Sequence, residues 1–252
     1  MFVAGVAAGA INTLVGSGTL VTFPVLLSVG YAPVVANVSN NIGLVPGAFT
    51  GAIGYRRELE GQRGRALRLG SMSALGGLAG AIALLVLPPG AFKAIVPAFI
   101  VIALVLIVLQ PRLNARMEAR RAAAGPAAGP AVRPQGEGLA TRAAVFATGI
   151  YGGYFGAAQG IMLLGFLGVA LPDDLQRVNA LKNVLAGTVN LVASIVFVLV
   201  ADVAWLPAGL IAAGSVAGGV LGARYGRRLP PAALRAVVVA VGLFALVRVV
   251  TS

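Results

Sequence analysis

Two clusters of amide side chains lie inside hydrophobic runs that are long enough to cross a bilayer. Residues 37–41 read Asn-Val-Ser-Asn-Asn, and residues 179–183, 142 positions later, read Asn-Ala-Leu-Lys-Asn. Within each cluster, side chains three and four positions apart share one face of a helix. An unpaired amide in hydrocarbon is costly, so these faces must turn inward. The candidate ligand contacts are Asn37, Asn41, Asn179 and Asn183. The alternative is hydrogen bonding between helices, a common use of Asn in membranes.

Lys182 is one of two lysines in the chain, and it follows Asn179 by three positions on the same expected helix. A buried cation requires an anion, which here would be Asp173, Asp174 or a bound substrate. The alternative is that the ammonium snorkels to the edge of the membrane, about 6 Å away along the helix. We favour an anion site that includes Lys182.

Two longer apolar runs, 2–29 and 143–171, are interrupted at their centres. Each apolar piece of the first run has about 13 residues, or about 20 Å of helix, which is too short to cross a bilayer comfortably. We expect a re-entrant hairpin that turns at 16–18, and a second that turns at 158–160. A half-helix beginning at position 19 would aim free N–H groups at a cavity, which suits an anion. The expected contacts at the two turns are Gly16, Ser17, Gly18, Thr19, Gln159 and Gly160.

The composition is that of an integral membrane protein. Mean hydropathy is +0.95, and 10% of the residues are charged, against about 25% in soluble domains. About 20 helical residues cross a hydrocarbon core. Six uninterrupted apolar runs match that length: 34–54, 67–87, 91–109, 178–200, 203–223 and 233–250. The net charge of +12 is explained by arginines in loops beside these runs rather than by nucleic-acid binding.

Several kinds of chemistry are excluded by composition. The chain has no Cys and no His, so it has no thiol chemistry, no Cys-based metal site and no Ser/His dyad. Its seven acidic residues all lie in loops or at the ends of the apolar runs, so the usual intramembrane proton relay is absent. No phosphate-binding Gly-rich loop is present, which argues against ATP-driven pumping. We expect no enzyme activity, no cofactor and no metal.

The offset of 142 residues extends to other pairs, which indicates an internal duplication. It pairs Gly18 with Gly160, and it pairs the glycine runs 76–80 and 218–222, which we expect to allow close helix packing. The Arg-rich loop at 55–66 corresponds to 197–208, which has no basic residue. Matched loops would therefore face opposite sides of the membrane, with the basic loops in the cytoplasm.

The sequence thus predicts an all-α integral membrane protein of two inverted-topology repeats, each a broken re-entrant helical hairpin plus three transmembrane helices. Repeat one is expected at 1–110 and repeat two at 143–252, joined by a flexible cytoplasmic linker at 111–142 that is rich in Ala, Gly, Pro and Arg. In the alternative, each broken run is one tilted helix and each repeat crosses four times.

Four segments together resemble the sulfite exporter TauE/SafE family of bacterial permeases: 9–24 (GAINTLVGSGTLVTFP), 54–59 (GYRREL), 152–160 (GGYFGAAQG) and 175–183 (LQRVNALKN). The resemblance implies a multi-pass protein of the bacterial inner membrane that exports sulfite or a small organosulfonate such as sulfoacetate. The family's glycine-rich loop carries over onto Gly16, Ser17 and Gly18. Its partner at 158–160 reads Ala-Gln-Gly, where many members have three glycines.

We therefore expect a secondary transporter that exports a small oxyanion by alternating access. Its expected partners are the small anionic substrate and the lipid bilayer, with no nucleic acid. The sequence leaves open whether the protein forms a homodimer. One rival is a passive anion channel built from the same donors. Another is a non-transporting membrane scaffold in which the Asn clusters only lock helices together.

Overall fold

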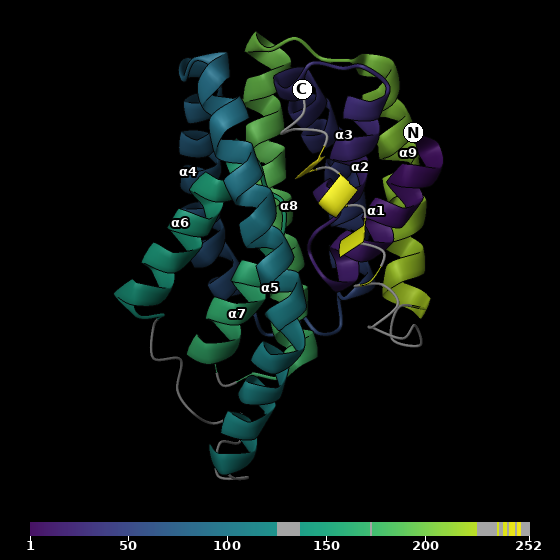
Figure 1. Cartoon of the computed structure of the whole chain (residues 1–252). Coiled ribbons are helices and arrows are strands. Elements are labelled where there is room, and N and C mark those ends of the chain that lie inside the picture. The colour runs from purple at the N-terminus through teal and green to yellow at the C-terminus, as the bar shows by residue number, and fades with distance from the viewer. Residues whose placement is uncertain are drawn as a thin grey trace.

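A computed structural model describes residues 1–124, 137–171 and 173–225, together with 236, 239–240, 242–244 and 246–247. The regular secondary structure of these residues is α-helical, which confirms the predicted class (Figure 1). Up to residue 225 the described helices are α1 (Phe2–Leu14), α2 (Thr19–Ser28), α3 (Pro33–Gly54), α4 (Arg63–Val86), α5 (Pro89–Ala124), α6 (Leu139–Tyr154), α7 (Gln159–Ala170), α8 (Leu175–Val200) and α9 (Trp205–Tyr225).

Four of the described helical segments are long and apolar enough to cross a membrane: α4, α8, α9 and the part of α5 from Gly90 to Arg112. They match four of the six predicted runs. The fifth run, 34–54, forms the 22-residue helix α3, which is long enough to cross but carries the polar cluster at 37–41. The sixth run, 233–250, falls largely outside the described residues.

Both interrupted runs form pairs of short helices, so the alternative of one continuous helix in each run is wrong. Helices α1 and α2 have 13 and 10 residues, and α6 and α7 have 16 and 12. The first break, at 15–18, lies where it was predicted. The second lies at 155–158, two to three residues earlier than predicted, because Gly156 and Ala158 both adopt left-handed backbone. Gln159 and Gly160 therefore belong to the first turn of α7.

The expected linker is partly helical in the structure. Helix α5 continues from its apolar segment to Ala124, and α6 begins at Leu139. Residues 111–124 and 139–142 are thus helical, while 125–136 lie outside the described residues. The division into repeats at 110 and 143 stays a prediction.

Each half of the chain packs one of its helices against helices of the other half. Helix α9, from the second half, packs against α1 and α3, and α4, from the first half, packs against α6 and α8. Figure 1 shows α1 and α9 on one side of the molecule and α4 and α6 on the other, with α3 and α8 between them. Helices α3 and α8 begin 142 positions apart, as do α4 and α9. Helices α2 and α7 begin 140 positions apart, so Gly18 and Gly160 are not equivalent.

The predicted glycine runs bring these helices into close contact. A Cβ at Gly80 on α4 would lie 2.1 Å from the carbonyl oxygen of Ile150 on α6. In the other half, a Cβ at Gly218 on α9 would lie 2.0 Å from the carbonyl oxygen of Val6 on α1. The expected role of these glycines in helix packing is thus borne out by the backbone distances.

Gly80→Ala is expected to lower stability by about 1–3 kcal/mol, because the methyl group can be accommodated only by moving α4 away from α6. Gly70→Ala is the matched control, since a Cβ at Gly70 on the same helix meets nothing within 4 Å. Thermal unfolding of the purified protein in detergent measures both. Equal midpoints for the two variants would contradict the close-packing role.

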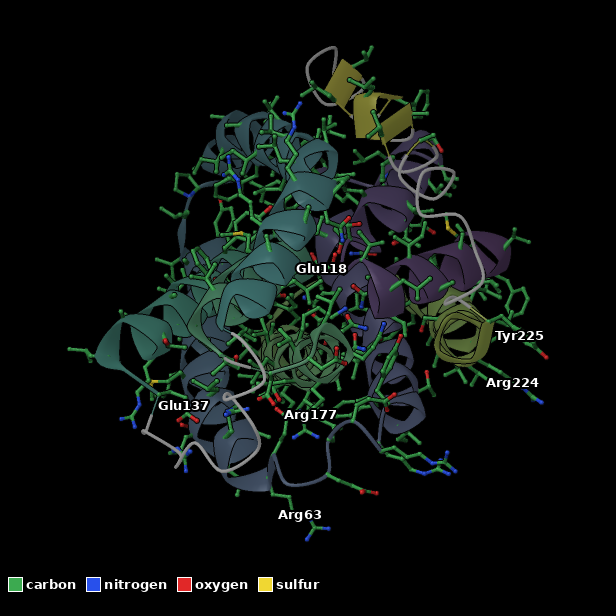
Figure 2. All side chains as sticks on the ribbon, turned by 90° about the horizontal axis from the view of Figure 1, so that it is seen from below. Arg63, Glu118, Glu137, Arg177, Arg224 and Tyr225 are labelled. Atoms are coloured by element: carbon green, nitrogen blue, oxygen red, sulfur yellow. The ribbon has the colours of Figure 1, made fainter. Side chains whose placement is uncertain are left out.

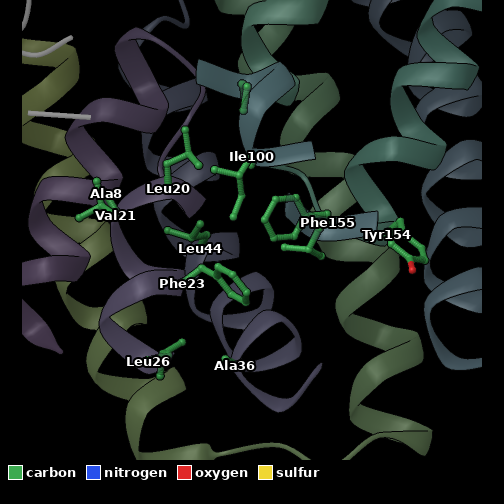
Figure 3. Close-up of a cluster of buried hydrophobic side chains, with 14 of the residues drawn as sticks. Ala8, Leu20, Val21, Phe23, Leu26, Ala36, Leu44, Ile100, Tyr154 and Phe155 are labelled. Atoms are coloured by element: carbon green, nitrogen blue, oxygen red, sulfur yellow. The ribbon is translucent and has the colours of Figure 1, made fainter. Parts of the chain in front are cut away.

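An apolar and aromatic cluster surrounds the second break. The rings of Phe23 on α2 and Phe155 in the break meet edge to face with centroids 5.2 Å apart. Phe92 and Phe99 on α5 pack against Tyr154 and Phe155. Figure 3 shows Phe23, Phe155 and Ile100 converging at the centre of this cluster. It holds α2, α5 and the end of α6 together, and so fixes the polar groups described next.

Candidate functional site

The first break leaves unpaired donors at the start of α2. The amides of Val15 and Gly16 both turn back to the carbonyl of Ile11, at 2.7 and 3.1 Å. Gly16 has a φ of 84°, a conformation that favours glycine. Within the described residues, the next three amides, 17–19, donate no hydrogen bond. The hydroxyl of Ser17 is fully buried and also has no partner there. The predicted half-helix starting at Thr19 with free N–H groups is confirmed.

The second break differs, because the first three amides of α7 donate hydrogen bonds. The amides of Gln159 and Ile161 donate to Gly156 and Ala158 at 3.2 and 3.0 Å. The amide of Gly160 donates across the molecule to the carbonyl of Gly16 at 3.0 Å. The first amide of α7 is therefore bonded, unlike that of α2, and within the described residues the amides of this break that donate no hydrogen bond are those of Ala157 and Ala158. The side-chain amide of Gln159 lies over Gly152 of α6, where an added Cβ would be 2.3 Å from its Cδ.

The two breaks meet at a pair of glycines. A Cβ built on Gly16 would lie 2.4 Å from the Cα of Gly160, and the reverse distance is also 2.4 Å. The same Cβ on Gly160 would lie 3.0 Å from Cδ of Lys182. The lysine side chain therefore passes directly beside the point where the two broken helices cross. The two broken helices thus meet at Gly16 and Gly160, with the Lys182 stem beside them.

Lys182 is 0% exposed, and its partners are backbone carbonyls. Its Nζ donates to the carbonyl oxygens of Asn12 and Thr13 at 3.0 and 3.2 Å. These carbonyls end α1, where the helix dipole is negative. The side-chain amides of Asn179 and Asn183 donate to the same Thr13 oxygen at 3.4 and 3.3 Å. Three predicted site residues of α8 thus converge on the end of one broken helix.

The carboxylates considered as partners of Lys182 are engaged elsewhere. Asp173 pairs with Arg65 and Arg177, and Asp174 caps the start of α8 by accepting from the amide of Gln176. Among the described residues, Lys182 has no carboxylate partner. The snorkelling alternative also fails, since the amino group is buried.

The asparagines of α3 make a related set of contacts. Asn37 donates to the carbonyl oxygen of Tyr154 at the end of α6, at 2.9 Å, as Asn179 does to the end of α1. Asn41 accepts from the Ser194 hydroxyl of α8 at 3.0 Å, which is a helix-to-helix hydrogen bond. Asn40, outside the predicted set, donates to the Thr19 hydroxyl at 3.3 Å and accepts from Thr22. Sequence alone had no signal for these serine and threonine partners beyond their polarity.

Several buried polar atoms near the breaks have no hydrogen-bond partner within the described residues: Ser17 Oγ, Asn37 Oδ1, Tyr154 Oη, Gln159 Nε2 and Asn179 Oδ1. Buried polar groups are normally satisfied, so a concentration of unpaired ones indicates a position for water or a ligand. Four of the five belong to predicted site residues. The fifth atom belongs to Tyr154, whose backbone carbonyl accepts the hydrogen bond from Asn37.

The family model for "Sulfite exporter TauE/SafE" matches residues 1–249. The chain belongs to this family. It is 27% identical over 227 residues to the "Probable membrane transporter protein ORF9" of Sinorhizobium sp, covering 89% of this chain and 81% of that protein. It is 24% identical over 237 residues to the "Probable membrane transporter protein YfcA" of Escherichia coli strain K12, covering 91% and 79%. No solved structure matches it. This TauE/SafE protein is therefore a multi-pass membrane transporter.

One end of this TauE/SafE protein carries an ionic network between the two halves, and Figure 2 labels its Arg177 in a view from below. Arg65 pairs with Asp173, and Arg177 pairs with Asp173 at 3.1 Å. Arg177 also donates to the carbonyl of Glu60 at 3.1 Å. Beside this network is a surface pocket of about 300 Å³, lined by Arg56, Leu59, Glu60, Gln62, Arg63, Ala66 and Val184. It lies at the basic end of the molecule that was predicted to face the cytoplasm.

Glu137, just before α6, accepts two hydrogen bonds from Arg68 of α4, at 2.8 and 2.9 Å. The Arg68 hydrogen bonds are the main cause that holds the pKa of Glu137 below its ordinary value. The pKa of Glu137 is thus lower in the folded than in the unfolded protein. The Arg68–Glu137 pair therefore stabilises the folded state fully when the pH is above the ordinary glutamate pKa of about 4.3. That contribution is lost as the pH falls through the folded-state pKa.

Acidification below about pH 4 should lower the midpoint of thermal unfolding in both the wild type and Glu137→Gln. The decrease is expected to be smaller in Glu137→Gln, because the variant has no carboxylate to protonate at this position. The variant should also start from a lower midpoint at pH 7, because it lacks the charged pair. Glu118→Gln, at an exposed position on α5, serves as control and should follow the wild type. Parallel pH profiles for Glu137→Gln and the wild type would contradict a role for this pair.

Proposed function

We propose that this TauE/SafE protein is a secondary transporter that exports a small oxyanion, sulfite or an organosulfonate such as sulfoacetate, across the bacterial inner membrane. One observation carries the proposal. The amino group of Lys182 is 0% exposed and has no carboxylate partner among the described residues. A buried cation without a counter-ion inside a membrane protein marks a site for an anionic ligand.

The electrostatic balance at Lys182 supports an anion. An ammonium group has three donors, and two of them are used by the carbonyls of Asn12 and Thr13. The end of α1 contributes about half of a negative charge, so about half of a positive charge remains uncompensated. A bound anion would accept the third hydrogen bond and complete the neutralisation.

The donors for the remaining oxygens of the anion would come from the start of α2. The free amides at 17–19 and the buried hydroxyl of Ser17 lie next in sequence to Gly16, which touches Gly160 beside the lysine stem. Glycine at both positions lets backbone and ligand approach each other closely. In this proposal Gly16, Ser17, Gly18 and Thr19 bind the oxyanion together with Lys182.

The other predicted site residues have supporting roles in the proposal. Asn37 and Asn179 hold the ends of the two first half-helices, α6 and α1, and Asn183 assists at α1. Gln159 has an unpaired Nε2 that could donate to the ligand, and Gly160 allows the close crossing. Asn41 bonds to Ser194, so in this proposal it links α3 to α8 rather than binding the anion.

Alternating access would arise from rocking of one repeat against the other. The reciprocal packing of α4 and α9, and the capping of each half's broken helix by the other half, support an inverted pair of repeats. In the proposed orientation the linker at 111–142 and the Arg-rich loops face the cytoplasm. The pocket beside Arg56 and Arg63 would then be where the anion enters from that side.

A thermal-shift screen of the detergent-purified protein tests the proposal. Sulfite, sulfoacetate, taurine, sulfate and small carboxylates are compared at equal ionic strength. We expect saturable stabilisation by sulfite or sulfoacetate, equivalent to about 2.7 kcal/mol at a concentration 100 times Kd. If none of these anions raises the unfolding temperature, the polar residues do not bind an anion, and the alternative that they only lock helices together is supported instead.

A passive anion channel is the second candidate, because the chain has no His and no carboxylate in mid-membrane for an ordinary proton relay. Reconstitution into liposomes separates the two. Saturable counterflow of the stabilising anion supports a carrier, whereas single-channel conductance supports a channel.

A further inference from the structure

The last turn of α1 ends in two carbonyls that no backbone amide satisfies. The amides of Val15 and Gly16 both bond to Ile11, so within the described residues the carbonyls of Asn12 and Thr13 receive no main-chain donor. Their donors are side chains from α8, above all Lys182 at 3.0 and 3.2 Å. A helix from one half of the chain is thus closed by a cation from the other half.

This arrangement has the form of a cation site. Carbonyl oxygens at the end of an interrupted helix, where the helix dipole is negative, are where broken-helix transporters hold a coupling sodium ion or proton. Here the ammonium of Lys182 lies against those oxygens with its stem beside Gly160 at the crossing of the breaks. The cation is covalently part of the chain.

The opposite half has no charged group in the corresponding position. Asn40 lies 142 residues before Lys182, and it bonds to the hydroxyls of Thr19 and Thr22. The carbonyl of Tyr154 at the end of α6 is closed by the neutral amide of Asn37. The two related polar clusters therefore differ by one positive charge, and that charge lies at the end of α1.

We infer that the Asn12 and Thr13 carbonyls form a monovalent-cation site occupied by the chain's own Lys182, which takes the place of a co-transported sodium ion. Lys182 is then a positioning residue that fixes the end of α1 in addition to any contact with the anion. One consequence is that anion flux should not require sodium, and this consequence rests on the proposed function. The cation site does not, since its occupancy can be measured without any substrate.

The test measures thermal unfolding of full-length Lys182→Ala in choline, sodium and methylammonium chloride at equal ionic strength. In choline, too large for the site, the unfolding temperature is expected to fall by about 5 °C relative to wild type, through the loss of charge-assisted hydrogen bonds. Methylammonium or sodium should restore at least about half of that fall with saturable dependence on concentration. The wild type should be indifferent to the cation.

Asn183→Ala is the matched control, because it removes a neutral donor from the same Thr13 oxygen and leaves the ammonium in position. Its stability should not depend on the cation. A Lys182→Ala protein that is equally destabilised in all three salts would overturn the cation site, since a packing defect does not distinguish cations. If Lys182→Ala does not fold, Lys182→Met, which keeps most of the stem, is measured in the same salts against the same criterion.

A second measurement compares sulfite efflux from wild-type proteoliposomes in sodium and in choline. Equal rates support the replacement of sodium by Lys182, and a rate that requires sodium overturns it. If neither sulfite nor sulfoacetate moves in either salt, the proposed function fails, and the stability of Lys182→Ala still decides whether the α1 carbonyls form a cation site.

Discussion

Replacing Lys182 with alanine is expected to reduce the rate of anion transport at least about tenfold, which corresponds to about 1.4 kcal/mol of lost interaction with the anion. The reason is that the ammonium is 0% exposed and lacks a carboxylate partner in the described part of the chain. Without it, the donors that the described residues offer an oxyanion at the crossing point would all be neutral. The initial rate of efflux from proteoliposomes, normalised to inserted protein, measures the effect.

Asn183→Ala separates the charge of Lys182 from the capping of α1. It deletes one donor to Thr13 and leaves the ammonium, so its rate should fall by less than about threefold, consistent with the loss of one neutral hydrogen bond. Size-exclusion chromatography establishes that both variants are folded. Wild-type rates in a folded Lys182→Ala protein would remove the lysine from the anion site.

Gly160→Ala is expected to abolish transport and to destabilise the protein by more than about 3 kcal/mol, beyond the usual range for overpacking. The added methyl would lie 2.4 Å from the Cα of Gly16 and 3.0 Å from Cδ of Lys182. Backbone cannot yield as a flexible side chain can, so the two breaks must separate. The contact between Gly16 and Gly160 beside the lysine stem would then be lost.

Gly165→Ala on the same helix, α7, is the matched control, because a Cβ there meets nothing within 4 Å. It should unfold and transport like the wild type, and helix propensity favours alanine over glycine by about 1 kcal/mol. Thermal unfolding and efflux are measured on both variants. A Gly160→Ala protein that matches Gly165→Ala in both would show that the breaks do not need to touch.

Much of this fold was predictable because hydrophobic length and glycine spacing determine it directly. The apolar runs at 67–87, 178–200 and 203–223 gave the cores of α4, α8 and α9. The break at 16–18 was predictable since Gly-Ser-Gly between two short apolar pieces disfavours continuous helix. The second break was misplaced because its local sequence is ambiguous. Ala158 adopts left-handed backbone, which alanine rarely does.

The candidate site was predictable in its residues and less so in its contacts. Periodicity placed Asn179, Lys182 and Asn183 on one inward face, as observed. Their partners, the carbonyls at the end of α1, could not be inferred. Every residue has a backbone carbonyl, so the residue types do not indicate which carbonyls accept hydrogen bonds from side chains. The same limit applies to the difference between the breaks, since α2 keeps free amides while α7 donates one to Gly16.

Equilibrium dialysis of sulfur-35 sulfite against the purified protein tests the central claim most directly, namely that a buried lysine at the crossing of two helix breaks binds a small oxyanion. The wild type is predicted to bind sulfite saturably at one site per chain, and sulfoacetate should compete. A folded Lys182→Gln protein should lose this binding. Saturable binding that persists unchanged in Lys182→Gln, or a folded wild type that binds neither anion, would contradict the account.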